Sequence, residues 1–504
     1  MAQRLAGLAG QVFDVVVIGG GINGASAARE AALAGYSVLL VERGDYGSGS
    51  TSRSSRLLHC GLRYLAPGGP MSAFLLRPKR LAQALRTVRR SMRTRAELVG
   101  ELGGRLRPVT MQLPIYSDGP YRPWQLDAAF TLLKGLGEGG VPLDYRRLPA
   151  AQALEELPFA PFLRDRDRLL SVAVYTEYQF DWPERLAVDL ALELQRLGAA
   201  AFNYTAVTDF TAEGEGWRVT LADESATGGG GRARADVRCR ALLNFAGPWI
   251  DEVNDAAEAR VRRTVDVTKG AHVVVRLPEA FRGQGLMAMT SDGHPFYCFP
   301  WRDAHFFGPT ETAYDGDRDR VRASDGDIEQ LLGLAGRELP GLFVERRHIL
   351  YSWAGLRPLT HDPGTFMGLR NRTLHDLGPV GGPPFLALTN GSLGAHRSTG
   401  RDVLAALGRR LAPSGPPRRG GGLAKTGPLA AELGPSEWLR IARDEQVVHL
   451  GDLLWARSGK VWDVGHGSAL ARSLAALVGS TLGWEQERQD REVELYLDEV
   501  RNLL

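Results

Sequence analysis

The sequence is poor in cysteine and has no long hydrophobic run. Its three cysteines, Cys60, Cys239 and Cys298, lie far apart, and no C-x-x-C pair occurs. This spacing argues against a disulfide framework and against a metal site, and it suits a reducing compartment. No stretch of 18 apolar residues exists, so no membrane-spanning helix is predicted. No signal peptide is recognisable either, and we expect a cytoplasmic protein.

The chain also lacks a strong charge of either sign. Its formal net charge is +3 over 504 residues, which gives nucleic-acid binding no general electrostatic support. The composition, 44% hydrophobic and 24% charged, is that of an ordinary globular protein. The length allows two or three domains.

What the sequence does contain is a complete dinucleotide-binding pattern near its start. The apolar run Val15 to Ile18 predicts a buried parallel strand. The G-x-G-x-x-G spacing follows at Gly19, Gly21 and Gly24. These glycines allow, in turn, a tight turn, the approach of a pyrophosphate to the backbone, and close packing of the next helix.

The segment after the glycines completes this unit. A helix of roughly Asn23 to Ala34 would direct its N-terminal amides at the pyrophosphate. A second strand, Ser37 to Val41, ends at Glu42, whose carboxylate can accept hydrogen bonds from ribose hydroxyls. Together these elements predict a nucleotide cofactor, and the glycines alone do not choose between NAD and FAD.

The remaining pattern predicts an α/β fold with three parts. We expect a discontinuous Rossmann-like nucleotide-binding domain over residues 12–95, 165–260 and 345–412. A second, α+β domain with an antiparallel sheet is expected over 96–164 and 261–344. Residues 413–435, rich in glycine and proline, predict a linker, and 436–504 predict a small helical domain.

A helix over residues 72–99 is predicted to carry a strongly basic face. Leu81, Leu85, Val88 and Met92 would form its apolar face. The basic face would comprise Arg77, Lys79, Arg80, Arg86, Arg89, Arg90, Arg93 and Arg95. A solvated face is one interpretation, and contact with anionic lipid headgroups, hence peripheral membrane association, is the other.

Several blocks resemble the FAD-dependent glycerol-3-phosphate dehydrogenases and oxidases, within the broader D-amino acid oxidase-like group. The resemblance covers almost the whole chain. The most specific block is Ser54 to Leu65, read as S-S-R-L-L-H-C-G-L-R-Y-L. Other matching blocks are Asp14–Glu42, Leu243–Trp249, Lys269–His272, Phe307–Glu311, Ser352–Leu359 and Arg443–Leu454.

The resemblance implies FAD as the cofactor, and the Ser/Thr-rich run Tyr46 to Ser55 suits a pyrophosphate and a flavin edge. A later strand and helix start, Leu388 to Gly394, would direct a second positive helix end at the flavin. The candidate cofactor residues are Gly19, Gly21, Asn23, Gly24, Glu42, Thr51, Ser52, Ser55, Gly247, Gly391, Ser392 and Leu393.

The same blocks supply candidates for catalysis. Oxidation of a secondary alcohol needs a base, and either His59 or His272 could serve. For each, the alternative is a packing or flavin-contacting histidine. An anionic substrate group needs fixed cations. The resemblance implies Arg63 and Arg357 for this role, with Lys269, Tyr64 and Thr310 as further contacts.

Two positions depart from the family pattern. Where the family usually has G-G-K-L-T-T, this chain reads Gly391 to His396 as G-S-L-G-A-H, so Ser392 replaces a lysine near flavin and substrate. Cys60 replaces a glycine beside His59. For Cys60, the alternatives are a small buried residue and a covalent flavin link or redox role.

These observations predict an FAD-dependent enzyme that transfers hydride from a small anionic alcohol, glycerol 3-phosphate or a close relative, to flavin. The alternative is a related flavoenzyme that oxidises an amine, an amino acid or a larger metabolite. A third interpretation is a flavoprotein without turnover. The electron acceptor, whether quinone, oxygen or a carrier protein, stays open, as does the oligomeric state, with a homodimer among the alternatives.

Overall fold

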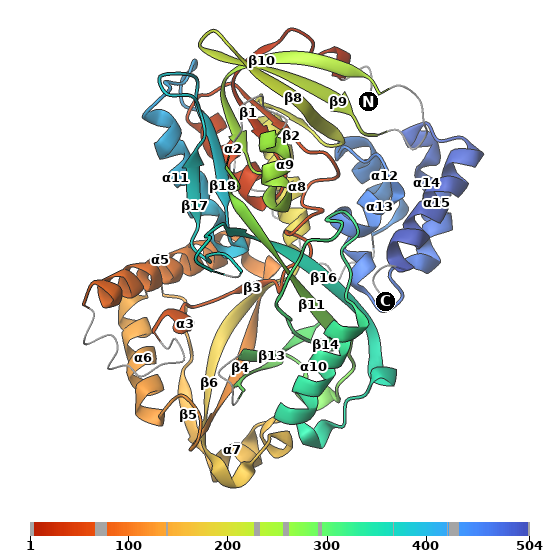
Figure 1. Ribbon diagram of the computed structural model, residues 1–504. Helices are drawn as coiled ribbons and strands as arrows, with labels where there is room; N and C mark the ends of the chain where they lie inside the picture. Colours follow the sequence, from red (N-terminus) through yellow and green to blue (C-terminus); the bar gives the residue numbers. More distant parts are fainter. Residues whose placement is uncertain are drawn as a thin grey trace.

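The computed structural model describes residues 5–65, 78–137, 140–225, 232–255, 262–290, 295–365, 367–420, 422 and 433–501. Within this part of the chain, two sheets and a group of C-terminal helices form the architecture (Figure 1). The α/β fold class predicted from the sequence is confirmed.

The first sheet is a parallel sheet of the dinucleotide-binding kind. Its order is β17-β18-β10-β1-β2-β7, and all neighbours are parallel except β17 and β18. Its strands are β1 (Val12–Ile18), β2 (Val38–Val41), β7 (Ala200–Phe202), β10 (Arg234–Asn244), β17 (Thr373–Asp376) and β18 (Phe385–Thr389). A hairpin, β8 (Thr205–Glu213) and β9 (Gly216–Asp223), extends it antiparallel to β10.

Three helices cover this sheet and come from distant parts of the sequence. Helix α2 (Ile22–Leu33) packs between α8 (Pro183–Arg196) and α11 (His396–Gly408). The buried face of α2 is rich in alanine, including Ala25, Ala28 and Ala32, which allows the helices to approach closely. The sheet is therefore assembled from three separate stretches of chain, because β10 and β18 return beside β1.

The second sheet is mostly antiparallel and carries the long strands in the lower half of Figure 1. Its order is β15-β11-β14-β13-β12-β4-β6-β3, with β16 paired to β11 and β5 to β6. The strands are β3 (Leu57–Leu58), β4 (Leu106–Tyr116), β5 (Arg146–Pro149), β6 (Leu169–Phe180), β11 (Val265–Val275), β12 (Gln284–Met289), β13 (Pro295–Trp301), β14 (Ala304–Phe307), β15 (Thr312–Ala313) and β16 (Ile349–Thr360).

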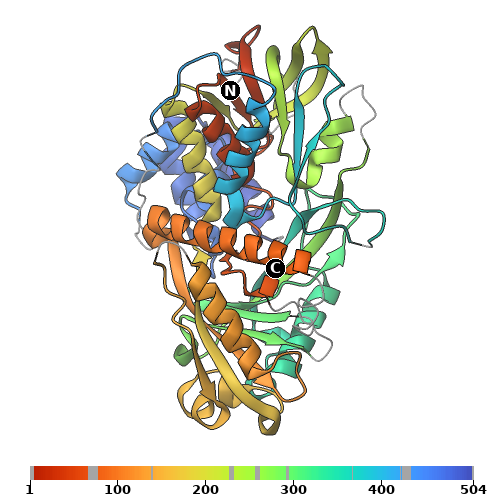
Figure 2. The same cartoon turned by 90° about the vertical axis from the view of Figure 1, so that its left-hand side faces the viewer.

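Helices flank the second sheet, and one of them crosses the molecule between the two sheets. These helices are α3 (Leu62–Leu65), α5 (Pro78–Leu102), α6 (Pro123–Leu136), α7 (Ala150–Glu156) and α10 (Asp325–Glu338). Figure 2 shows α5 lying across the middle of the molecule, with α6 below it. Short helix α9 (Ile250–Asp255) follows β10.

Three strands lie in a different sheet from the one that the predicted boundaries imply, and the first of them is β3 of segment 12–95, which pairs with β6. Strand β6 falls in segment 165–260 and β16 in segment 345–412, both assigned to the nucleotide-binding domain. Antiparallel pairing along nearly their full lengths places β6 against β4 and β16 against β11 instead. Pairing with strands that are distant in the sequence determines the sheet to which each of these strands belongs. The rest of the division into domains stays a prediction.

The C-terminal helices pack against both sheets. They are α12 (Pro435–Asp444), α13 (Leu450–Asp452), α14 (Ser468–Leu482) and α15 (Gln486–Arg501), with a π-helical turn at Leu453–Arg457. Trp462 lies edge-on to Trp301 at 5.7 Å, so the helices share a core with the second sheet. Buried Arg457 pairs with Asp45, which lies just after β2.

Helix α5 is less basic on its surface than the sequence predicts. Arg95 is fully buried and donates to the carbonyl groups of Val141, Pro142 and Thr176, so its place on the basic face was wrong. The aliphatic part of an arginine side chain is long enough for its guanidinium group to reach either solvent or internal carbonyl groups. Residues 72–77 of the predicted helix lie outside the described residues. No helix in the described part is long and apolar enough to cross a membrane.

Candidate active site

The glycine-rich turn sits at the carboxyl end of β1, between β1 and α2. Gly19 has φ +104°, and a Cβ there would lie 2.5 Å from the Phe245 carbonyl oxygen. A Cβ on Gly24 would overlap the carbonyl oxygen of Gly19. Gly21 differs, because its Cβ would meet only the Thr51 hydroxyl, at 3.3 Å. The first and third glycines are required by the protein's own packing, whereas Gly21 faces space that the protein leaves open.

Polar groups around this turn connect the segments predicted to hold the cofactor. The Thr51 hydroxyl accepts from the Ile22 amide at 3.1 Å, and Glu42 accepts from the Gly20 amide at 2.6 Å. Asn23 donates to the Gly391 carbonyl at 2.7 Å, which joins α2 to the segment after β18. The other amide atom of Asn23, Oδ1, is buried and has no hydrogen-bond partner in the described structure.

Two helix starts at this edge have N-cap residues that do not cap them with a side chain. These residues are Gly21 for α2 and Ser392 for the 3₁₀ turn at Leu393–Ala395 that leads into α11, and neither start has an acidic residue in its first turn. Ser392, at the start of that turn, is exposed. Of the first α2 amides, that of Ile22 is taken by Thr51. Uncapped N-terminal amides are anion sites, and the positive helix ends suit a pyrophosphate and a reduced flavin.

Two further predicted cofactor residues differ in whether they could contact a cofactor. Gly247, in the turn after β10, has φ +60° and open space where a Cβ would be. Ser52 is buried and donates within its own segment to the carbonyl groups of Ser48 and Gly49. Trp249, not predicted, lies against Gly49, whose Cβ would be 3.3 Å from the indole. The open space, the uncapped amides and the orphaned Asn23 oxygen fit a dinucleotide along this edge.

His272 lies on β11, and its ring contacts Trp353, Phe306 and Ser55. It stacks on Trp353 of the neighbouring strand with ring centroids 4.6 Å apart and an interplanar angle of 13°. Its Nε2 lies 3.0 Å from the Ser55 hydroxyl. Burial, together with the charges of Arg357 and Arg56, lowers the pKa of His272 well below its usual value. The imidazole is therefore neutral near pH 7 and can accept a proton.

Arg357 lies on β16, opposite Thr268 of β11. Its guanidinium lies over Gly270, where any Cβ would overlap it. It donates to the Thr310 carbonyl at 3.4 Å, whereas Nη1 is buried and has no partner in the described structure. No described carboxylate is within ion-pair distance of it. Burial lowers the pKa of Arg357, so an unmatched cation is held beside His272.

Lys269 is not a free cation in this site. Its ammonium group pairs with Asp327 at 2.6 Å. The same carboxylate accepts from the Thr310 hydroxyl at 3.0 Å, and that hydroxyl accepts from the Ala271 amide at 2.9 Å. Lys269, Asp327 and Thr310 therefore form an internal network, and the positive charge of Lys269 is neutralised within the protein. Asp327 was not predicted as a site residue. The sequence signal that could have drawn attention to it is the Ser324-x-x-Asp327 capping-box pattern at the start of α10.

His59 lies in a different environment from His272. Its side chain is 43% exposed, and its Nδ1 is 3.8 Å from Glu177. It lines a small pocket together with Tyr175, Tyr297 and Phe299, and His272 does not line this pocket. Arg63 and Tyr64 fall within α3, and their side chains lie outside the described part. The structure thus brings together His272, Ser55 and Arg357 and places His59 apart from them.

Cys60 has the environment of an inert residue. It is fully buried, and its backbone amide donates to Glu177. Burial and the nearby carboxylate raise the pKa of the thiol well above its usual value. A thiol that stays protonated is a poor nucleophile, which favours the small buried residue over a flavin link.

Comparison with known proteins places the chain in a family. The model of the family described as FAD dependent oxidoreductase matches residues 14–396. A glycerol-3-phosphate dehydrogenase of Synechocystis sp. is 30% identical over 475 residues, covering 90% of this chain and 81% of that protein. An aerobic glycerol-3-phosphate dehydrogenase of Staphylococcus haemolyticus is 29% identical over 407 residues, covering 80% and 68%.

A solved structure agrees with this placement. The glycerol-3-phosphate dehydrogenase from Bacillus halodurans complexed with FAD superposes with a TM-score of 0.74 at 20% identity, covering 99% of this chain and 97% of that one. At this identity the likeness shows the fold alone. The family match and the 30% identical relative carry the assignment: the chain belongs to the FAD-dependent oxidoreductases and is of the glycerol-3-phosphate dehydrogenase type.

Proposed function

We propose that this protein oxidises a small anionic secondary alcohol, with glycerol 3-phosphate as the first candidate. The observation that carries the proposal is Arg357, a partly buried arginine whose buried Nη1 has no hydrogen-bond partner and which has no carboxylate within ion-pair distance in the described structure. An unmatched buried cation is costly unless a ligand neutralises it. The relatives reported above are named for glycerol 3-phosphate, which carries the required anion.

The proposed chemistry divides between two side chains. Arg357 binds the anionic group and so fixes the alcohol carbon relative to His272. His272 accepts the hydroxyl proton at Nε2, the ring nitrogen that already faces the Ser55 hydroxyl. When bound, FAD supplies the acceptor for the hydride that leaves the same carbon. The remaining network, Lys269 with Asp327 and Thr310, holds the backbone that Arg357 contacts.

His272 is the stronger of the two candidate bases. The Arg357 guanidinium lies over Gly270, two residues before His272 on β11, so the base and the anion site adjoin. His59 is exposed and sits beside Glu177 in a separate pocket. His272→Asn and His59→Asn should therefore differ: we expect the first to abolish flavin reduction and the second to retain a measurable rate. The reverse ranking would assign the base to His59.

The test of the substrate is anaerobic bleaching of the flavin band. Glycerol 3-phosphate should bleach it, and glycerol, which has the same secondary hydroxyl and no anion, should not. A small hydroxy acid tests whether any anion suffices. Bleaching by glycerol at an equal rate would contradict the role of Arg357.

A second candidate function is oxidation of an amino acid. The observation that favours it is Ser392, an exposed, neutral residue where the family usually has a lysine. Arg357 would bind an amino acid carboxylate as well as a phosphate. Bleaching by small amino acids, with none by glycerol 3-phosphate, would establish this alternative.

A further inference from the structure

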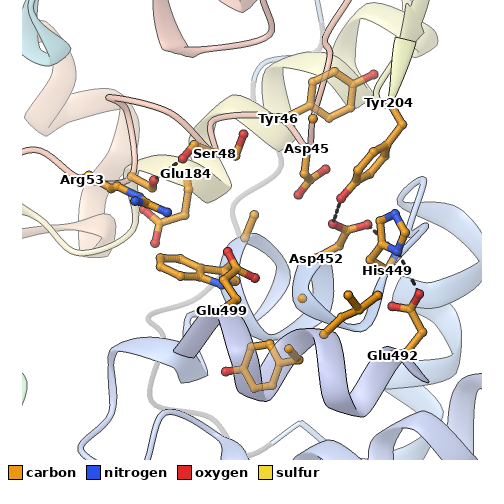
Figure 3. A pocket seen from close by; sticks show the side chains of 17 residues that line it. Asp45, Tyr46, Ser48, Arg53, Glu184, Tyr204, His449, Asp452, Glu492 and Glu499 are labelled. Atoms are coloured by element: carbon orange, nitrogen blue, oxygen red, sulfur yellow. Dashed lines mark hydrogen bonds and ion pairs between the residues drawn. The ribbon is translucent and has the colours of Figure 1, made fainter. Parts of the chain in front are cut away.

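A cavity separate from the flavin edge lies between the chain after β2 and the C-terminal helices. Its volume is about 420 Å³, within the range that accommodates small-molecule ligands. One wall comes from residues 44–53 and the start of α8, and the other from α13, the π-helical turn and α15 (Figure 3). Of the predicted cofactor and substrate residues, only Ser52 lines it, and that hydroxyl is used inside its own segment.

Most charges around this cavity are already matched within the protein. Figure 3 shows carboxylates converging on it from both walls. Four of them have internal partners: Asp45 pairs with Arg457, Glu184 with Arg56 and Glu492 with His449, whereas Asp452 accepts from the Tyr204 hydroxyl at 2.5 Å. These groups hold the two walls together and leave little charge for a ligand.

Arg53 and Glu499 are the exceptions. Arg53 donates to the Val321 carbonyl at 3.2 Å, and its Nε is buried without a hydrogen-bond partner in the described structure. Burial lowers the pKa of Arg53, and the charge of Glu499 opposes that shift, so the two groups are within electrostatic reach. They nevertheless form no ion pair with each other. Apart from Asp452, which is held by hydrogen bonds, the cavity therefore has among the described residues one basic side chain, Arg53, and one acidic side chain, Glu499, that lack an ion-pair partner, and the two come from opposite walls.

The lining between these two charges is largely apolar. Trp455 contributes its ring, with the Arg53 guanidinium 5.6 Å from the ring centroid, and Tyr496 lines the same space. A cationic ligand would bring a like charge beside partly buried Arg53, and an anionic ligand would bring one beside Glu499, which lies on the exposed side of the cavity. A ligand that carries both charges satisfies both groups.

We propose that this cavity binds a small zwitterion, with its ammonium group toward Glu499, its carboxylate toward Arg53 and an apolar body against Trp455. Arg53 offers the planar donors that carboxylates accept in pairs. The site does not depend on the proposed function, because it contains neither Arg357 nor His272.

Three probes that share one aromatic body test the proposal: L-phenylalanine, 2-phenylethylamine and 3-phenylpropanoate. Titration calorimetry on the FAD-loaded enzyme should show binding of phenylalanine at least about tenfold tighter than that of either singly charged probe, as two charge pairs require. Equal affinities, or no binding of any probe, would overturn the proposal.

Variants then locate the binding. Glu499→Gln should weaken phenylalanine binding by about tenfold or more, since it removes one of the charge pairs. Glu494→Gln is the matched control, because Glu494 is exposed on the same helix and does not line the cavity. Equal effects of the two variants would overturn the proposal.

Arg357→Ala separates this cavity from the flavin edge. It should leave phenylalanine binding unchanged. Loss of binding in that variant would place phenylalanine at the flavin edge and end the zwitterion proposal. Failure of glycerol 3-phosphate to bleach the flavin, with phenylalanine binding intact, would instead end only the proposed function.

Discussion

Replacing Arg357 with alanine should mainly weaken substrate capture. The guanidinium has one 3.4 Å contact to a carbonyl group, and its Nη1 is buried and unpartnered in the described structure. An anion would therefore gain strong, charge-assisted hydrogen bonds, each contributing about 1.5–3 kcal/mol. Because part of that energy offsets desolvation of the anion, we expect a net loss of roughly 2–4 kcal/mol, or about 30-fold to 900-fold in kcat/KM.

The assay is steady-state oxidation of glycerol 3-phosphate with an artificial electron acceptor, alongside the flavin content of each variant. Arg357→Lys keeps the charge and loses the planar fork, so its kcat/KM should fall between wild type and alanine. Added guanidinium should restore part of the activity of the alanine variant. Flavin content should not change, because no hydrogen bond in the described structure joins Arg357 to a predicted cofactor residue. A kcat/KM within about threefold of wild type would refute the anion site.

Four further predictions follow from the site and the surface. Gly21→Val should yield folded protein without FAD, because a Cβ there meets only Thr51 and the added methyl groups would occupy the space of the cofactor. Gly24→Val should misfold, because its Cβ would overlap the Gly19 carbonyl oxygen. Flavin absorbance, flavin released by acid and thermal unfolding distinguish the two results. The rate of flavin reduction at saturating substrate should fall only below pH 6.5, since the pKa of His272 is lowered and its neutral form persists on acidification; a limb above pH 7 would contradict this assignment. Ser392→Lys should raise flavin reduction by glycerol 3-phosphate if the native substrate differs, and rates near 1–10³ per second in wild type would show the serine to be neutral. Sedimentation with anionic vesicles at low salt should exceed that with neutral vesicles if α5 contacts headgroups, and equal partition would remove the electrostatic argument.

The dinucleotide unit could be predicted from the sequence because its signals are local. The strand, the spaced glycines, the helix and the acidic strand end fall within about 30 residues of each other, and each has a distinct physical cause. The structure begins β1 at Val12 and α2 at Ile22, close to the expected positions. The return of the chain to this sheet could also be predicted, because the last residues of β10 and all of β18 form short apolar runs that end shortly before a glycine.

Pairings between distant residues could not be predicted in the same way. Strands β6 and β16 have the apolar pattern of either sheet, and only their antiparallel partners decide where they lie. The same limit applies to charges. Arg95 and Lys269 read as available cations in the sequence, yet one ends at internal carbonyls and the other at Asp327. A charge is free only when no partner folds against it, and partners are a property of the tertiary structure.

The count of unmatched cations bears directly on the identity of the substrate. With Lys269 neutralised and serine at position 392, Arg357 supplies a single unmatched positive charge from the described side chains near His272. A phosphate monoester carries between one and two negative charges near neutral pH, with a second pKa near 6, whereas a carboxylate carries one. Binding a phosphate in this site therefore calls for a second cation, which the family resemblance assigns to Arg63 on α3. A carboxylate needs only Arg357. The choice between phosphate and carboxylate thus rests on how many positive charges converge at this point, more than on which residue accepts the proton.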